Sequence, residues 1–170
     1  MKKFYILLWF FWALRVVACS IVSASVLASL ITFWLYIKQG FIPLEKEVFE
    51  ALWDVFVFWF ALSLNFAVLF ALFRSVKYIF NKCYGGYSFK LMTCAQEQSF
   101  IDPVGYGDLV KFWRKWFMLL IWLSAAFMIG DFVLFDYYNI YVLYGVILLS
   151  GFFSFMFIGA RCKQTRIVKC

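Results

Sequence analysis

Between residues 83 and 116 the chain reads CYGGYSFKLMTCAQEQSFIDPVGYGDLVKFWRKW. This stretch is the only long polar interval in an otherwise apolar sequence. It divides the chain into two halves, and each half is long enough for a pair of membrane-spanning helices. The side of the membrane on which this interval lies therefore decides the topology of the whole chain.

The composition indicates an integral membrane protein. Of the 170 residues, 66% are hydrophobic and 25% are aromatic, and the mean hydropathy is +0.90. Soluble domains have closer to half of their residues apolar. A soluble chain of this length could not bury so much Phe, Trp and Leu, and its net charge of +7 is better explained by orientation in a bilayer than by nucleic-acid binding.

We expect an all-α, polytopic membrane protein that forms one four-helix transmembrane domain over residues 1–170. Four apolar blocks predict spans at residues 16–37, 51–73, 116–135 and 140–160, with a tight turn at 136–139 and a cytoplasmic loop at 74–115. The first block begins at Phe4 and is interrupted by Arg15, which would snorkel to the headgroups. Residues 4–14 either continue the first helix or form an extension on the membrane interface.

The basic residues are distributed unevenly between the two sides of this topology. The N-terminus, the central interval and the C-terminus together carry 14 of the 16 Lys and Arg residues, and only Lys38 and Lys46 fall on the other side. Cytoplasmic segments of membrane proteins are enriched in Lys and Arg. We therefore expect both termini and the central interval to be cytoplasmic, in a bacterial inner membrane.

The cysteines and the absence of histidine limit the possible chemistry. Without histidine the chain can form no bis-His haem site, no His-ligated metal site and no Ser-His or Cys-His nucleophile, so we expect no cofactor and no enzyme activity. No two cysteines form a C-x-x-C motif. Four of them are expected to be free thiols in or beside a reducing cytoplasm: Cys83, Cys94, Cys162 and Cys170.

The first span contains a stripe of small residues. Ser20, Ala24, Ala28 and Thr32 recur every four residues, a spacing that allows another helix to approach closely in lipid. Packing within the chain and a dimer face both fit this pattern, and we favour packing within the chain. The preceding string Val16-Val17-Ala18-Cys19 also fits a lipoprotein cleavage box, but the sequence after Cys19 remains apolar, so we interpret Cys19 as an ordinary helix residue.

The string Val104-Gly105-Tyr106-Gly107-Asp108 is similar to the filter of potassium channels, where backbone carbonyls replace the hydration shell of the ion. Such a filter opens toward the outside, whereas the charge distribution places this string inside. Pro103 stands where the filter motif has Thr, and the preceding residues are too polar for a re-entrant helix. We therefore interpret the string as a Gly-containing turn that leads into a helix.

The order of the segments resembles the RDD family of small bacterial membrane proteins. Residues 102–111 are similar to the family's entry from loop to helix, and the family's first-span motif is matched at Arg15, Ala18 and Ile21 but has Val22 in place of Asp. Its C-terminal motif is matched at 161 and 163–165 and is replaced at 166–168. Both signature aspartates are thus missing. The resemblance implies the topology, while the cation/proton exchange associated with the family does not carry over.

Two classes of function remain. The first is a non-catalytic subunit or scaffold of a membrane complex, RDD-like in layout, in contact with lipid and with other membrane subunits or copies of itself. The alternative is a small transporter or a cation/proton-coupled permease, whose path would use Asp54, Asn65 and Asp131. Residues expected to contact lipid or a partner are Arg15, Lys111, Arg114 and Lys115. We favour the scaffold, with no nucleic-acid partner.

The segment before the third span alternates aromatic and basic residues. At helical spacing Phe112, Trp113 and Trp116 fall on one side, and Lys111, Arg114 and Lys115 fall on the other. This pattern predicts an amphipathic lead-in that lies at the membrane interface.

Overall fold

The computed structural model describes residues 2–40, 43, 45–92, 100, 102, 104–135, 140–161 and 165–170. Several of the expectations above concern residues outside this set. They are the thiols of Cys94 and Cys162, the filter position Pro103, the turn at 136–139, and the motif residues Lys163 and Gln164.

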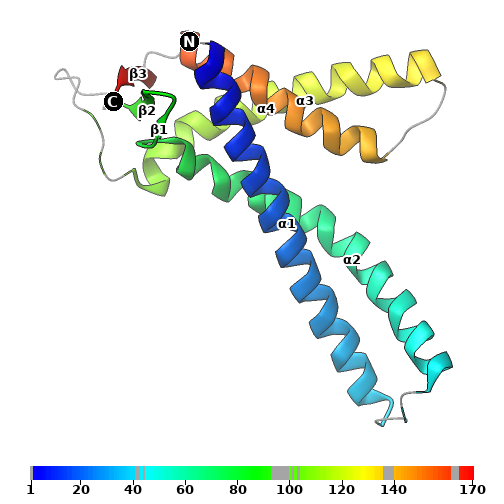
Figure 1. Ribbon diagram of the computed structural model, residues 1–170. Coiled ribbons are helices and arrows are strands. Elements are labelled where there is room, and N and C mark those ends of the chain that lie inside the picture. Colours follow the sequence, from blue (N-terminus) through cyan, green and yellow to red (C-terminus); the bar gives the residue numbers. More distant parts are fainter. Residues whose placement is uncertain are drawn as a thin grey trace. The chain divides into compact units, whose positions relative to one another are not determined.

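Four long helices dominate the chain (Figure 1): α1 (Lys2–Lys38), α2 (Lys46–Ser75), α3 (Tyr106–Phe135) and α4 (Ile140–Arg161). All four are long and apolar enough to cross a membrane, so the described residues contain the predicted number of candidate spans. α4 begins at the predicted residue, and α3 begins ten residues earlier than expected, so it includes the predicted lead-in.

Residues 4–14 continue the first helix rather than leaving it. The 37 residues of α1 make a helix of about 55 Å, longer than the roughly 30 Å of a hydrocarbon core. α1 continues through Arg15 without a break. The helix is therefore long enough to contain both a span and an extension beyond it. Cys19 lies in the middle of this helix.

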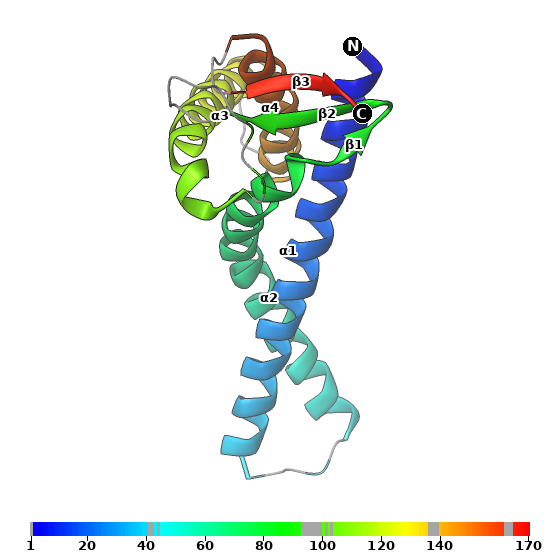
Figure 2. The ribbon, with the colours of Figure 1, turned by 90° about the vertical axis from the view of Figure 1, so that its left-hand side faces the viewer.

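The prediction of an all-α chain with a central loop was incomplete. The central interval and the C-terminal tail form an antiparallel sheet in the order β1-β2-β3, with β1 at Cys83–Tyr84, β2 at Tyr87–Leu91 and β3 at Thr165–Lys169 (Figure 2). Gly85 and Gly86 connect β1 to β2 with positive φ angles of 58° and 84°, which glycine adopts without strain. A 3-10 helix at Val76–Ile79 leads from α2 toward the sheet.

The pairing of β2 with β3 joins segments that are far apart in the sequence. Tyr87 pairs with Lys169 and Leu91 pairs with Thr165. In the sequence, all of α3 and α4 comes between these two strands. The register continues at Cys170, whose backbone N–H donates to the carbonyl of Gly86 over 3.0 Å. Main-chain hydrogen bonds therefore join the strand that precedes α3 to the strand that follows α4.

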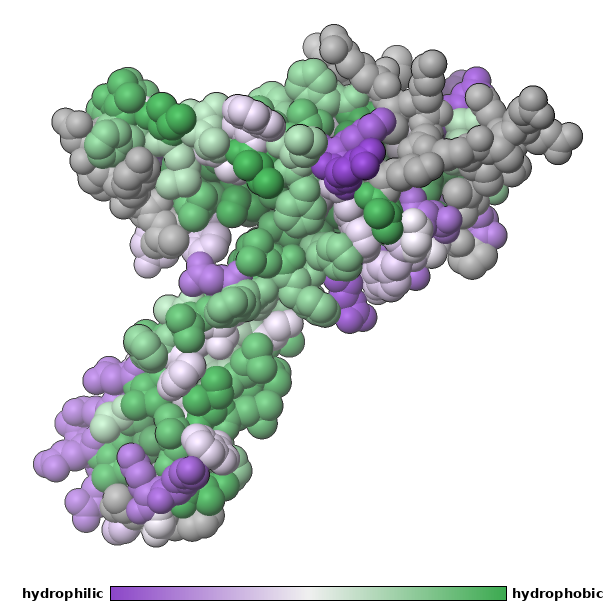
Figure 3. All heavy atoms as spheres, turned by 180° about the vertical axis from the view of Figure 1, so that it is seen from behind, coloured by the Kyte–Doolittle hydropathy of each residue, from purple (hydrophilic) through white to green (hydrophobic). Residues whose placement is uncertain are grey.

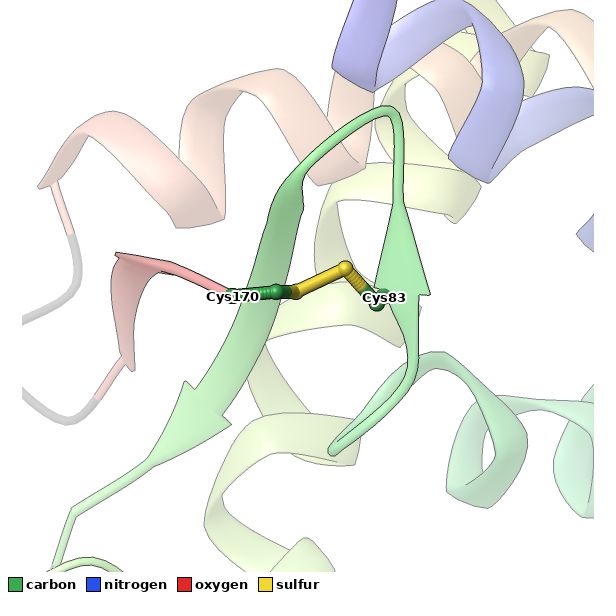
Figure 4. Close-up of a disulfide and its surroundings, with 2 residues drawn as sticks. All are labelled: Cys83 and Cys170. Carbon is green, nitrogen blue, oxygen red and sulfur yellow. A yellow bond between two sulfur atoms is a disulfide. The ribbon is translucent and has the colours of Figure 1, made fainter.

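A disulfide between Cys83 and Cys170 joins the two outer strands of this sheet across β2 (Figure 4). Their Cα atoms are 6.2 Å apart. The expectation that these two cysteines are free thiols was therefore wrong for the structure described here. The pairing could not be foreseen because β3 was not recognised, and only the β2–β3 register brings the end of the chain beside β1. Cys19 is a free cysteine on α1.

The chain forms two compact units, Met1–Ala13 with Val76–Cys170 and Leu14–Ser75. The core of the first unit is largely aromatic. Phe4, Leu8 and Trp12 form a buried stripe on the first turns of α1, and Trp12 contacts Phe155 of α4 and Trp116 of α3 at ring-centroid distances of 5.0 and 6.1 Å.

A second group of aromatic rings in the same unit connects the sheet to α3. Phe80 lies 5.5 Å from Phe89 of β2 and 5.1 Å from Phe112 of α3 between ring centroids, and all three side chains are buried. Phe4 of α1 contacts Tyr87 of β2 at 6.2 Å. The N-terminus, the central interval and the C-terminal strand thus belong to one packed cluster.

The second unit is a helical hairpin with small buried side chains. Ala24 and Ala28 of α1 are fully buried, and Ser20 is nearly so. On α2 the buried residues include Ser63, Ala67 and Ala71. Small residues allow helix backbones to approach closely in a bilayer. Figure 3 shows hydrophobic residues over most of the visible face of this hairpin, with hydrophilic residues toward its tip.

Candidate functional site

A hollow near the far end of the α3–α4 hairpin contains a carboxylate. It has a volume of about 360 Å³ and is lined by five residues of α3 and two of α4: Ala126, Phe127, Gly130, Asp131, Leu134, Val142 and Val146. Among the described residues of this lining, Asp131 is the only one with a charged side chain. It is half-buried, and it lies four residues before the end of α3. The described part of the lining is therefore an apolar groove that carries the carboxylate of Asp131.

The other two residues of the predicted transport path lie on α2, in the other unit. Asp54 and Asn65 are both exposed, and they are separated by eleven residues, which is about 16 Å along a helix axis. The amide nitrogen of Asn65 donates to the carbonyl of Ala61, one turn earlier in the same helix, over 2.9 Å. The structure therefore does not bring Asp54, Asn65 and Asp131 together within either unit.

A second hollow lies between α1 and α2. It has a volume of about 680 Å³ and is lined by apolar, aromatic and hydroxyl-bearing residues: Ser29, Leu30, Thr32, Phe33, Tyr36, Leu52 and Phe56. Thr32, the last residue of the predicted small-residue stripe, is half-buried at this site. None of the described lining residues is charged, so this part of the hollow is apolar apart from its hydroxyl groups.

The filter-like string forms the start of α3. Tyr106 is the first helical residue, and the backbone N–H of Gly105 donates to Oδ2 of Asp108 over 2.9 Å. This is the arrangement of a capping box, in which a side chain in the first helical turn accepts a hydrogen bond from the residue at the N-cap. Asp108 therefore caps the helix, and the glycine string is a turn at a helix start, as the sequence pattern indicated.

The amphipathic lead-in packs its aromatic side inside the chain. Phe112, Trp113 and Trp116 are buried, Trp116 completely, while Arg114 and Lys115 are exposed. The expected separation of the two sides is present, but the aromatic side contacts Phe80 and Trp12 rather than lying free at the interface. The side chain of Lys111 is outside the described residues, and Arg15 is exposed on α1.

Three lysines near the sheet lie over aromatic rings, an arrangement that the sequence analysis missed. The ammonium nitrogens of Lys77, Lys82 and Lys90 lie 4.8, 5.9 and 5.0 Å from the ring centroids of Tyr106, Tyr78 and Phe100. These rings are all exposed. Amphipathic aromatic and basic side chains of this kind are enriched where a membrane protein meets the headgroups.

Comparisons with known proteins give no functional assignment. Among the residues that the structure describes, no group of three Cys, Asp or Glu side chains is placed to hold a metal ion. The chain matches no family model, no curated protein and no solved structure.

Proposed function

We propose that this chain is a non-catalytic integral subunit of a membrane complex, located in a bacterial inner membrane and RDD-like in its layout. The observation that carries this proposal is the exposure of α3. Only 6% of its most apolar stretch is buried inside the chain, against 33% for that of α4. A helix that packs so little against its own chain has most of its surface available to other membrane helices.

The polar content of α3 distinguishes a partner from lipid alone. A helix that faces only hydrocarbon has no reason to keep a carboxylate near its end in an apolar groove, because polar groups in lipid cost free energy. Bulky apolar side chains such as Trp122, Val133 and Leu134 are each more than two-thirds exposed around it. A partner helix would cover this surface and surround the carboxylate with polar groups.

The transporter alternative has weaker support from the geometry. A proton- or cation-coupled path needs titrating groups that succeed one another across the membrane. Asp54 and Asn65 belong to one unit and Asp131 to the other, and the two residues on α2 are both on its exposed surface. We therefore favour assembly over transport.

The proposed orientation places both termini and the central interval in the cytoplasm. The β2–β3 pairing and the contact between Phe4 and Tyr87 support a common side for these three segments. The excess of Lys and Arg in the same segments supports the cytoplasmic side. In a reducing cytoplasm Cys83 and Cys170 would be thiols, and main-chain hydrogen bonds would then hold the sheet.

The test is purification in mild detergent from the native membrane. We expect a larger membrane protein in fixed stoichiometry, and we expect replacement of Ile129 and Val133 with Trp to remove it, because added bulk on α3 blocks close helix approach. The matched control replaces Phe66 and Phe70 of α2, which are also exposed and one turn apart, with Trp. Purification as a homo-oligomer alone would contradict the proposal and favour transport.

A further inference from the structure

The α3–α4 groove has features of a specific binding site for a helix (called the seat below) rather than of a general lipid-facing surface. A β-carbon added at Gly130 would meet nothing within 4 Å, so the wall of the groove is open at this residue. Phe127 and Val142 form apolar sides, and the Asp131 carboxylate supplies the charge. A glycine in a membrane helix allows another backbone to approach closely.

In the part of the chain that the structure describes, no basic side chain pairs with Asp131. Among the residues that the structure describes, no hydrogen bond or ion pair is found for its carboxylate. The nearest described cation of α3 is Lys115, sixteen residues earlier and thus about 24 Å away along the helix. A carboxylate at the edge of hydrocarbon is stabilised by an opposite charge, because attraction between charges strengthens as the effective dielectric constant falls.

A second copy of this chain cannot supply that charge in an ordinary symmetric pair. A two-fold interface built on this groove places each Asp131 against the same surface of its partner, which brings like charges together. On α3 and α4 the basic residues lie at the ends opposite the groove, from Lys111 to Lys115 and at Arg161. A copy that meets this groove through its own α3 and α4 would therefore present apolar residues at the depth of Asp131. Lys38 and Lys46, which are expected on the same side of the membrane as Asp131, already lie over the ring of Trp34 and beside Glu50. A partner with a different sequence therefore fits the groove better than a second copy.

We propose that the α3–α4 groove seats a membrane-spanning helix of another protein, which carries a Lys or Arg about one turn from one end of its apolar stretch. The basic side chain pairs with Asp131, and the partner backbone packs at Gly130. This inference rests on the proposed function as a complex subunit and names the class of partner. The position of Asp131 near the end of α3 fits a long basic side chain that reaches toward the headgroups.

The test uses the full-length chain in vesicles of neutral lipid and a synthetic transmembrane peptide of Leu and Ala. One peptide carries a single Lys about one turn from one end, and a matched peptide carries Met at that position. Association is measured by energy transfer between dyes on chain and peptide. We expect the Lys peptide to bind about tenfold more tightly, the ratio that corresponds to 1.4 kcal/mol.

Four variants assign this preference to the groove. Asp131→Asn should abolish it and Asp131→Glu should keep it, whereas Gly130→Leu should weaken binding of both peptides by filling the groove. Asp54→Asn is the control, because it removes an exposed carboxylate from the other unit. Equal binding of the two peptides, or a preference that survives Asp131→Asn, would overturn the inference.

The two proposals fail separately. A stoichiometric partner found in detergent, together with equal binding of the Lys and Met peptides, would leave the subunit proposal standing and remove the charged seat. A Lys preference that depends on Asp131, together with purification as a lone homo-oligomer, would leave the seat and contradict the subunit proposal.

Discussion

Gly151 of α4 leaves the space that the indole of Trp12 occupies. A β-carbon built on Gly151 would lie 2.5 Å from Cζ3 of Trp12 and 2.6 Å from its Cη2. Trp12 cannot move aside easily, because it is buried and packs edge-to-face against Trp116 and Phe155. The absence of a side chain at one residue of α4 thus allows the first turns of α1 to enter the core of the larger unit.

Gly151→Ala should therefore destabilise the protein, although Ala favours helix formation more than Gly does. Overpacking a close-packed core costs about 1–3 kcal/mol. The measurement is the midpoint of thermal unfolding in detergent. Gly145→Ala on the same helix is the matched control, since a β-carbon there meets nothing within 4 Å, and it should leave the midpoint unchanged or raise it. A midpoint for Gly151→Ala at or above that of the parent chain would contradict this packing.

Asp108→Ala should weaken the start of α3. It removes the acceptor for the Gly105 N–H, and an intramolecular hydrogen bond contributes about 0.5–1.5 kcal/mol to stability. Asp108→Glu should retain most of the stability, because Glu is the usual residue in a capping box. Thermal unfolding of both variants checks this. If the two variants are equally stable, the hydrogen bond does not contribute to stability.

Potassium-selective conductance of the chain in planar bilayers would revive the filter interpretation.

The redox state of Cys83 and Cys170 reports the orientation of the chain. In a variant with Cys19, Cys94 and Cys162 replaced by Ser, the proposed cytoplasmic side predicts that the Cys83–Cys170 disulfide is reduced in intact cells, because the cytoplasm is reducing. A membrane-permeant maleimide that adds mass should therefore shift the protein by two tags before lysis. After treatment with a mild oxidant the tags should no longer attach, because the disulfide forms. A disulfide already present in untreated cells would place the sheet outside and invert the topology.

Arg114→Glu combined with Lys115→Glu should impair insertion of the second helical pair. Both side chains are exposed at the start of α3 and contribute to the cytoplasmic excess of positive charge. Charge reversal weakens attraction to anionic lipid, in which each basic residue contributes about 1 kcal/mol. The measurement is the accessibility of an engineered cysteine near Ile140. The double replacement Arg114→Lys and Lys115→Arg is the control and should behave like the parent chain. An unchanged accessibility pattern in the Glu variant would contradict this role.

The sequence predicted the four helices because long apolar runs have few other stable forms. It also predicted the Gly-containing turn before α3 and the two-sided pattern of Phe112 to Trp116, since both depend on neighbours within two turns. Local spacing did not show what covers the aromatic side. Phe80 and Trp12 are distant in sequence from Phe112 and Trp116, and only the fold brings them into contact.

The sheet was missed although two local signals were present. Gly85-Gly86 between short polar and aromatic segments is a two-residue hairpin signal, and Thr165, Ile167 and Val168 are β-branched residues that favour strands. Each strand is short, and the partners are separated by two membrane helices. The groove at Asp131 could not be predicted for a similar reason, since its shape depends on how Val142 and Val146 of α4 face α3.

The pairing of β2 with β3 also orders events during biosynthesis. β2 leaves the ribosome before α3 and α4 are made, whereas β3 follows both of them, so the sheet can be completed only after the second pair of helices has been synthesised. Until then, one edge of β2 is unpaired, and Phe89, which is fully buried in the complete fold, lacks its pairing partner Ile167. Completion of the sheet therefore marks a chain whose last two helices have been made. In the proposed topology, a hairpin that fails to insert would leave an exposed strand edge that quality-control proteases can recognise.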